Sequence, residues 1–162
     1  MEMFLKPYTW LLALHVGSVI VGLGPSFIYA RIGKAGAAEP AHALFALRLN
    51  HALSTRWTHP LSIVVLVPGF LLIWVTGYPV MQMPWLLASI VLYLASFLYA
   101  TFVNAKDLEA ILAIVEQGPP ASQPPDVQAE LLRRRTRVRY GGLFMRSVVL
   151  IVLVLMVAKP AF

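Results

Sequence analysis

Long apolar stretches alternate with short polar ones along the chain, and this pattern predicts four membrane-spanning helices. A helix that crosses a bilayer needs roughly 20 mostly apolar residues. Four stretches approach or exceed this length, at about residues 7–30, 60–77, 84–103 and 141–158. We therefore expect an all-α fold, a four-helix transmembrane bundle, built as one integral membrane domain over residues 1–162.

The polar segments between the spans are expected to form amphipathic helical extensions on the cytoplasmic side. Residues 33–40, GKAGAAEP, suggest a turn-rich connection. Over residues 41–57, one helical face collects Phe45, Leu49, Ala52, Leu53 and Trp57. This segment predicts either a helix on the inner membrane surface or a cytoplasmic extension of the second span. The third span is expected to continue to residue 116, break at GPPASQPP, and be followed by a helix that starts near Asp126 and runs into the fourth span.

Composition supports the membrane assignment, and charge placement predicts its orientation. The chain is 59% hydrophobic and only 12% charged, whereas about a quarter is usual in soluble domains. The loops after the first and third spans carry most of the net charge of +6, and the loop TGYPVMQMP carries none. Because basic loops stay cytoplasmic, we expect a multi-pass protein of the bacterial inner membrane with both termini outside.

The run RRRTRVR, residues 133–139, is the densest basic cluster of the chain. Its position beside a span predicts contact with the lipid bilayer, in particular with anionic lipid. No aromatic residue interleaves the cluster, so no nucleic-acid partner is expected.

Missing residue types exclude several functional classes. The chain has no cysteine, which removes thiolate metal sites, iron–sulfur clusters and disulfides. All acidic residues lie outside the predicted spans: Glu2, Glu39, Asp107, Glu109, Glu116, Asp126 and Glu130. Ion-coupled transporters and carboxylate-based enzymes usually place a carboxylate at membrane depth, so neither class is favoured.

His15 is the main candidate for chemistry, because an ionisable residue inside a span is a functional candidate by default. It could be a structural histidine bound to a neighbouring helix, a haem or metal ligand, or a proton-transfer group. The nearby small residues Gly17, Ser18 and Gly24 are expected to let another helix or a flat ring approach. Proline is expected to bend the first span at Pro25 and the second at Pro68.

A second histidine, His59, cannot share one haem iron with His15 in the predicted topology. At 1.5 Å per residue the two lie roughly 15 Å apart in depth, whereas two axial nitrogens each sit about 2 Å from a metal. A haem b on His15 would therefore need an open site, a weak partner such as Met156, or a ligand from another subunit.

Two further residue groups suggest ligands. Arg31, Arg56, His59 and Arg146 fall at a similar inner depth. Together they could clamp the carboxylates of an amphipathic anion, or the arginines could extend to lipid phosphates. On the outer side, Met81 and Met83 form one Met-x-Met pair and Met1 and Met3 another, and thioethers favour Cu(I).

Three motifs carry a family resemblance: LHVGSVIVGLGPSF, LVPGFLLIWVTG and LVLMVAKPAF. With His15 and the terminal Met156, Lys159 and Pro160, they resemble a widespread bacterial family of predicted four-helix integral membrane proteins without an assigned function. More distantly, the outline resembles the four-helix membrane protoporphyrinogen oxidase and the copper-resistance D-like membrane domain.

The oxidase resemblance implies a haem on His15 and, as an alternative function, an enzyme of tetrapyrrole synthesis. That family has a lysine in its third helix, whereas here residues 84–103 hold none. The copper-resistance resemblance implies a copper-handling membrane protein. The interpretation we favour is a membrane protein that binds haem b and acts as an accessory subunit beside other membrane subunits or copies of itself, with no assigned catalytic residue.

Overall fold

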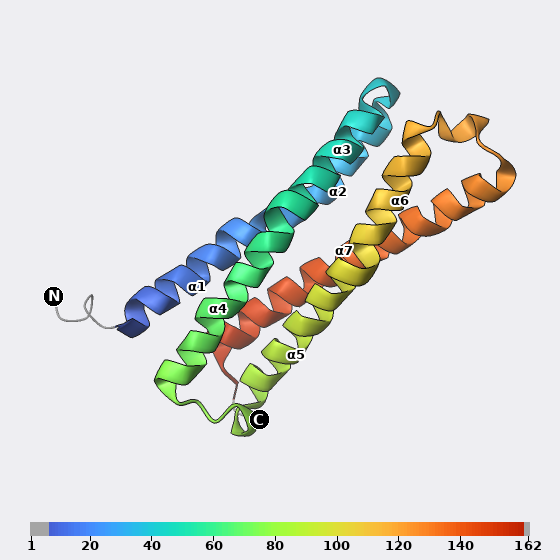
Figure 1. The fold of residues 1–162 in the computed structure, drawn as a ribbon. Coiled ribbons are helices and arrows are strands. Elements are labelled where there is room, and N and C mark those ends of the chain that lie inside the picture. Colours follow the sequence, from blue (N-terminus) through green and yellow to red (C-terminus); the bar gives the residue numbers. More distant parts are fainter. Residues whose placement is uncertain (1–6, 161–162) are drawn as a thin grey trace.

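A computed structural model of the chain describes residues 7–160, and all long elements in this range are helices, with no strand. Four helical stretches are long and apolar enough to cross a membrane: Pro7–Ala38, Pro40–Thr76, Pro84–Glu116 and Pro125–Ala158. They confirm the all-α four-helix prediction (Figure 1). Each has 32 to 37 residues, more than the roughly 20 that a bilayer requires. Met1 and Met3 lie outside the described residues.

The first stretch consists of α1 (Pro7–Leu23), a 3-10 turn (Gly24–Phe27) and α2 (Tyr29–Ala38). Pro25 is the second residue of that turn, where the α-helix of the first span is interrupted; the bend predicted there stays a prediction. The expectation of a turn-rich connection at residues 33–40 was wrong, because residues 33–38 belong to α2. The glycine there serves packing: a Cβ on Gly36 would collide with the Cβ of Ala46 in α3.

The second stretch settles the two alternatives left open for residues 41–57. A 3-10 turn (Pro40–His42), α3 (Ala43–Leu53), a π-helical turn (Ser54–Thr58) and α4 (His59–Thr76) follow one another without a break. The amphipathic segment is thus an extension of the second span. The helix continues through Pro68, and it ends at Gly77, whose φ of 64° suits glycine.

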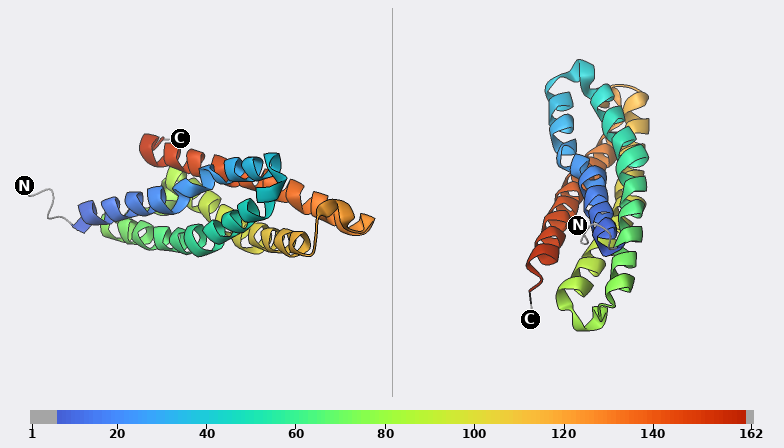
Figure 2. Two further views of the ribbon diagram at one scale, coloured as in Figure 1. Left: turned by 90° about the horizontal axis from the view of Figure 1, so that it is seen from above. Right: turned by 90° about the vertical axis from the view of Figure 1, so that its left-hand side faces the viewer.

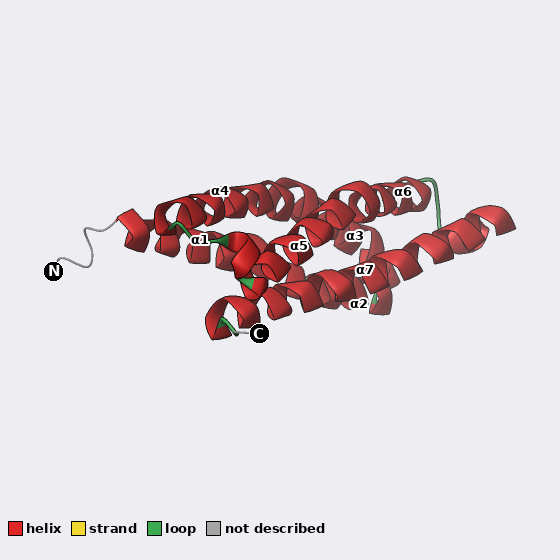
Figure 3. Ribbon diagram, turned by 90° about the horizontal axis from the view of Figure 1, so that it is seen from below, coloured by secondary structure: helices red, strands yellow, loops and turns green. Residues whose placement is uncertain are grey.

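The third and fourth stretches follow the predicted pattern. Helix α5 (Pro84–Tyr99) passes through a π-helical turn (Ala100–Asn104) into α6 (Ala105–Glu116), and α7 (Pro125–Ala158) is one uninterrupted helix. Short links with 3-10 turns join the stretches (Figure 3). The turns after α2 and α6 lie at one end of the molecule, and the α4–α5 turn lies at the other with the end of α7 (Figure 1).

The four stretches pack as two antiparallel hairpins. Helix α1 packs on α4 and α2 on α3, while α5 and α6 both pack on α7. Between the hairpins, the main contacts join α3 to α6 and the Gly24–Phe27 turn to α7. Figure 2 shows the two hairpins lying side by side along the long axis. The interior is small as a result: only 11–17% of the most apolar window of each span is buried within the chain.

The glycines of the first span act differently from the prediction. A Cβ on Gly17 or Gly24 would meet no atom within 4 Å, so neither admits a neighbouring helix. Gly22 does so instead, because its Cβ would lie 2.9 Å from that of Leu61 in α4. The close approach of α1 to α4 therefore depends on Gly22, and spacing alone did not distinguish the three positions.

Candidate functional site

A cavity of about 2060 Å³ lies between the two hairpins. This exceeds the roughly 300–1,000 Å³ of ordinary ligand pockets. Its walls come from all four helical stretches, and His15, His59 and Arg146 are among the lining residues. The cavity exists because each hairpin packs mainly on itself, while the contacts between hairpins are restricted to a few segments.

His15 lies on α1 where this helix faces α4. Its Nδ1 is 3.1 Å from the carbonyl oxygen of Val65. Gly69, one turn further along α4, leaves room for the ring, since a Cβ there would lie 3.1 Å from the His15 Cε1. The half-buried imidazole is thus held on one edge by the backbone of α4.

The contact with Val65 assigns the histidine tautomer. A backbone carbonyl only accepts hydrogen bonds, so Nδ1 must carry the proton and donate it. Nε2 then keeps its lone pair on a ring that lines the cavity. Histidines that bind metals usually have this arrangement, in which one ring nitrogen donates to a carbonyl or carboxylate and the other binds the metal.

His59 occupies a different level of the cavity. It stands at the start of α4, six residues before Val65, or about 9 Å along a helix axis. Its ring stacks on Phe97 with centroids 5.4 Å apart. Nearby, the Tyr93 hydroxyl donates a hydrogen bond of 2.6 Å to the Ser62 carbonyl oxygen. His15 and His59 line one cavity, but the structure does not bring them together.

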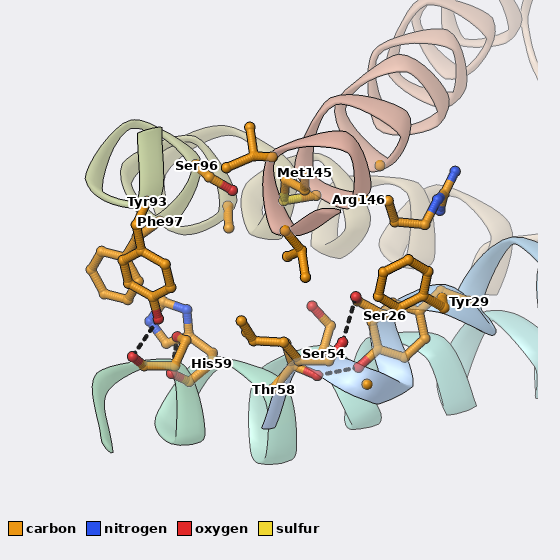
Figure 4. Close-up of a pocket in the computed structure, with 18 of the residues that line it drawn as sticks. Ser26, Tyr29, Ser54, Thr58, His59, Tyr93, Ser96, Phe97, Met145 and Arg146 are labelled. Atoms are coloured by element: carbon orange, nitrogen blue, oxygen red, sulfur yellow. Dashed lines mark hydrogen bonds between the residues drawn. The ribbon is translucent and has the colours of Figure 1, made fainter. Parts of the chain in front are cut away.

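Polar side chains gather where the helices are irregular. The 3-10 turn Gly24–Phe27 and the π turn Ser54–Thr58 lie beside each other. The hydroxyl of Tyr29, at the start of α2, is hydrogen-bonded to that of Thr58. The Trp57 indole nitrogen also donates to the Val21 carbonyl, at 3.0 Å. In Figure 4, His59, Tyr93 and Phe97 stand on one side of this part of the cavity, and Tyr29 and Arg146 on the other. π turns frequently mark functional sites.

The structure separates the four residues predicted to clamp an anion. His59 and Arg146 line the cavity. Arg31 and Arg56 are exposed and are not among the lining residues. Within residues 7–160, Arg146 makes no ion pair, and its guanidinium lies near Gly142, where a Cβ would be 3.5 Å from one of its nitrogens. Arg146 is therefore a cation that lines the cavity and has no acidic partner among the described residues.

The methionines at the predicted outer side, Met81 and Met83, lie apart from the cavity. Met81 is 84% exposed in the turn between α4 and α5, and Met83 follows it at the start of α5. Neither lines the cavity, whereas Met156 does. Among the described residues, no group of three or more histidines, acids or cysteines could hold a metal ion. Near Met156, the Lys159 ammonium sits 5.8 Å from the centroid of the Trp85 ring.

A buried ion-pair cluster escaped the sequence analysis. Asp107, on α6, is 3% exposed. It accepts a hydrogen bond of 2.7 Å from Arg134, and bonds of 2.6 and 3.0 Å from Arg137, both on α7. The sequence did contain one indication of this cluster: Arg134 and Arg137 are three residues apart and therefore share a helix face. What the sequence did not show was that α6 faces them.

The fold and the cavity define an integral membrane protein of four spans, arranged as two helical hairpins around a central space. The chain belongs to the family described as predicted integral membrane protein (DUF2269), whose sequence model matches residues 9–160. No curated protein and no solved structure gives a significant match.

Proposed function

We propose that this protein binds haem b through His15 and serves as a membrane-embedded accessory subunit. The observation that carries the proposal is the His15 ring itself, fixed by Val65 through Nδ1 while lining a large cavity. With the proton on Nδ1, Nε2 keeps the lone pair that an iron would need. When bound, haem would supply one-electron chemistry, with a potential set by its ligands and surroundings.

The residues present fit a haem with one protein ligand from this chain. Val65 orients the imidazole, and Gly69 provides the space for it. His59 cannot complete the coordination, because it lies about 9 Å further along α4 and its ring stacks on Phe97. The second axial position would stay open or be filled weakly, with Met156 as the thioether that lines the same cavity.

The accessory role is supported by how little of each span the chain covers itself. Large apolar side chains are exposed on the first two spans, including Trp10 at 65% and Trp74 at 84%. In a bilayer such faces contact either lipid or the helices of another membrane protein. Partner helices, or a second copy of this chain, would bury them.

The test is an absorbance spectrum of the detergent-purified protein from haem-replete cells. We expect a b-type Soret band in the wild type, its loss in His15→Ala, and its retention in His59→Ala. His59→Ala is the matched control, because it removes an imidazole from the same cavity at another level.

Two outcomes would contradict the proposal. A colourless but well-folded wild type would show that His15 is a structural histidine bound to Val65. A band lost equally in both variants would show that one haem needs both histidines, which contradicts a haem held by His15 alone.

A further inference from the structure

The arginines of α7 divide into two opposite faces. At 100° per residue, Arg135, Arg139 and Arg146 fall within about 40° of one another, and all three line the cavity. The other face carries Arg133, Arg134 and Arg137, which pair with Glu130 or Asp107. Among the described residues, the three arginines facing the cavity have no ion pair, whereas those on the opposite face all do.

The charge of the cavity wall is therefore of one sign. Lys34 adds a fourth cation on α2, and Lys159 lies toward the other end. No aspartate or glutamate of residues 7–160 lines the cavity. A concave surface with only positive charge concentrates anions. Arg146 is half-buried and has no acidic partner within residues 7–160, so an anionic ligand would neutralise its charge.

The polar head of a ligand would lie at the level of the cavity where Arg139 and Arg146 stand. Asn50 and Asn104 line the cavity, and each has a buried side-chain oxygen without a hydrogen-bond donor. Asn104, at 8% exposed, belongs to the π turn of the third span. Both oxygens have almost no exposed surface, so the two asparagines make this level of the wall polar without themselves contacting a ligand.

The remaining space suits hydrocarbon. The walls beyond the polar level are mostly apolar, and the cavity holds about 2060 Å³, twice the volume of a large ligand pocket. The main backbone contacts between the hairpins join α3 to α6 and the Gly24–Phe27 turn to α7. Helices α4 and α5 are linked by side chains, through the hydrogen bond from Tyr93 to the Ser62 carbonyl and the stacking of His59 on Phe97. The apolar part of the wall therefore suits long hydrocarbon chains.

We propose that an anionic phospholipid occupies the space between the hairpins, with its phosphate on Arg139 and Arg146 and its acyl chains toward His15. Its negative charge complements a wall whose charged residues, within residues 7–160, are all cations. Ten residues of the first span, about 15 Å, separate His15 from the Pro25 turn that contacts α7. The phosphate position is thus separate from His15, so the test of phosphate binding does not depend on haem.

The experiment measures thermal unfolding of the purified protein in a neutral detergent as dioleoyl phosphatidylglycerol or dioleoyl phosphatidylcholine is added. The anionic lipid should raise the Tm in a saturable way, and phosphatidylcholine should raise it much less. Arg139→Gln and Arg146→Gln should each weaken the apparent affinity about tenfold, the effect of losing one charge-assisted hydrogen bond. Arg146→Lys should restore part of it.

Arg133→Gln is the matched control, because it removes the same charge from the same helix but on the opposite face. An equal loss of affinity in this control would overturn the proposal in favour of general surface attraction. The proposal would also be overturned if both lipids raised the Tm equally, or if inorganic phosphate raised it as much as phosphatidylglycerol does. Arg139 is exposed, so Arg139→Gln should fold normally. The test therefore stays valid even if Arg146→Gln fails to fold.

Discussion

The imidazole Nδ1 of His15 lies 3.1 Å from the carbonyl oxygen of Val65, fifty positions away in the sequence. This contact joins α1 to α4 across the interface that forms the first hairpin. The hydrogen bond uses Nδ1 of the imidazole and does not involve Nε2. A single hydrogen bond thus stabilises the hairpin and orients the histidine proposed to bind haem.

Removing this hydrogen bond should destabilise the protein modestly. His15→Ala is expected to lower the free energy of unfolding by about 0.6–1.7 kcal/mol, the range for one hydrogen bond between helices in a membrane. Unfolding of haem-free protein in mixed micelles would measure it. No change at all would mean that the contact with Val65 adds nothing to stability.

Gly69→Ala should move the imidazole without removing it. The added Cβ would stand 3.1 Å from the His15 Cε1 and 3.3 Å from Nδ1, so the ring must shift and the bond to Val65 must weaken. The protein should stay folded, and any haem band should shift or broaden rather than vanish. A spectrum and Tm identical to those of the wild type would show that the His15 ring does not lie against Gly69.

Gly22 and Gly17 should respond in opposite ways to the same substitution. Gly22→Ala places a Cβ 2.9 Å from that of Leu61, so α1 must move away from α4 and stability should fall by about 1–3 kcal/mol. Gly17→Ala meets no atom within 4 Å and should be neutral or stabilising by up to about 1 kcal/mol. Equal effects on Tm would contradict the packing of the first hairpin.

Asp107→Asn should be one of the more damaging single changes at the end of the molecule that holds the α6–α7 turn. It removes the buried carboxylate from Arg134 and Arg137, whose side chains are 26% and 44% exposed. Because the two arginines are partly solvated, we expect a loss of about 1–3 kcal/mol, below that of a fully buried pair. Glu116→Gln, which breaks the exposed pair with Arg48, is the control and should lose under about 1 kcal/mol.

Orientation in the membrane can be tested with single cysteines at Ala37, Ala121 and Gln82. The first two lie in or near the turns at one end of the molecule, and Gln82 lies in the turn at the other (Figure 1). If the basic loops are cytoplasmic, only Gln82→Cys should react with a membrane-impermeant thiol reagent on intact cells. If only Ala37→Cys is labelled, the protein has the orientation opposite to the predicted one.

The sequence by itself determined the membrane class, the number of spans and most helix ends. These features depend on local physics: an apolar run of sufficient length must be helical in a bilayer, because its backbone can bond only to itself. Proline and glycine then marked where helices start and stop, as at Pro25, Gly77 and Pro84. The sequence also selected His15 and Arg146, since polar residues inside spans are few enough to be conspicuous.

Only the tertiary structure decided which residues face one another. Gly17, Gly22 and Gly24 look equivalent in the sequence, and only Gly22 meets a neighbouring helix. The run RRRTRVR reads as one basic cluster, yet α6 brings Asp107 to one face of α7 and leaves the other face to the cavity. Such partners lie tens of residues apart in the sequence. Which of them meet depends on how the helices and hairpins pack, and a local pattern of apolar and polar residues does not determine that packing.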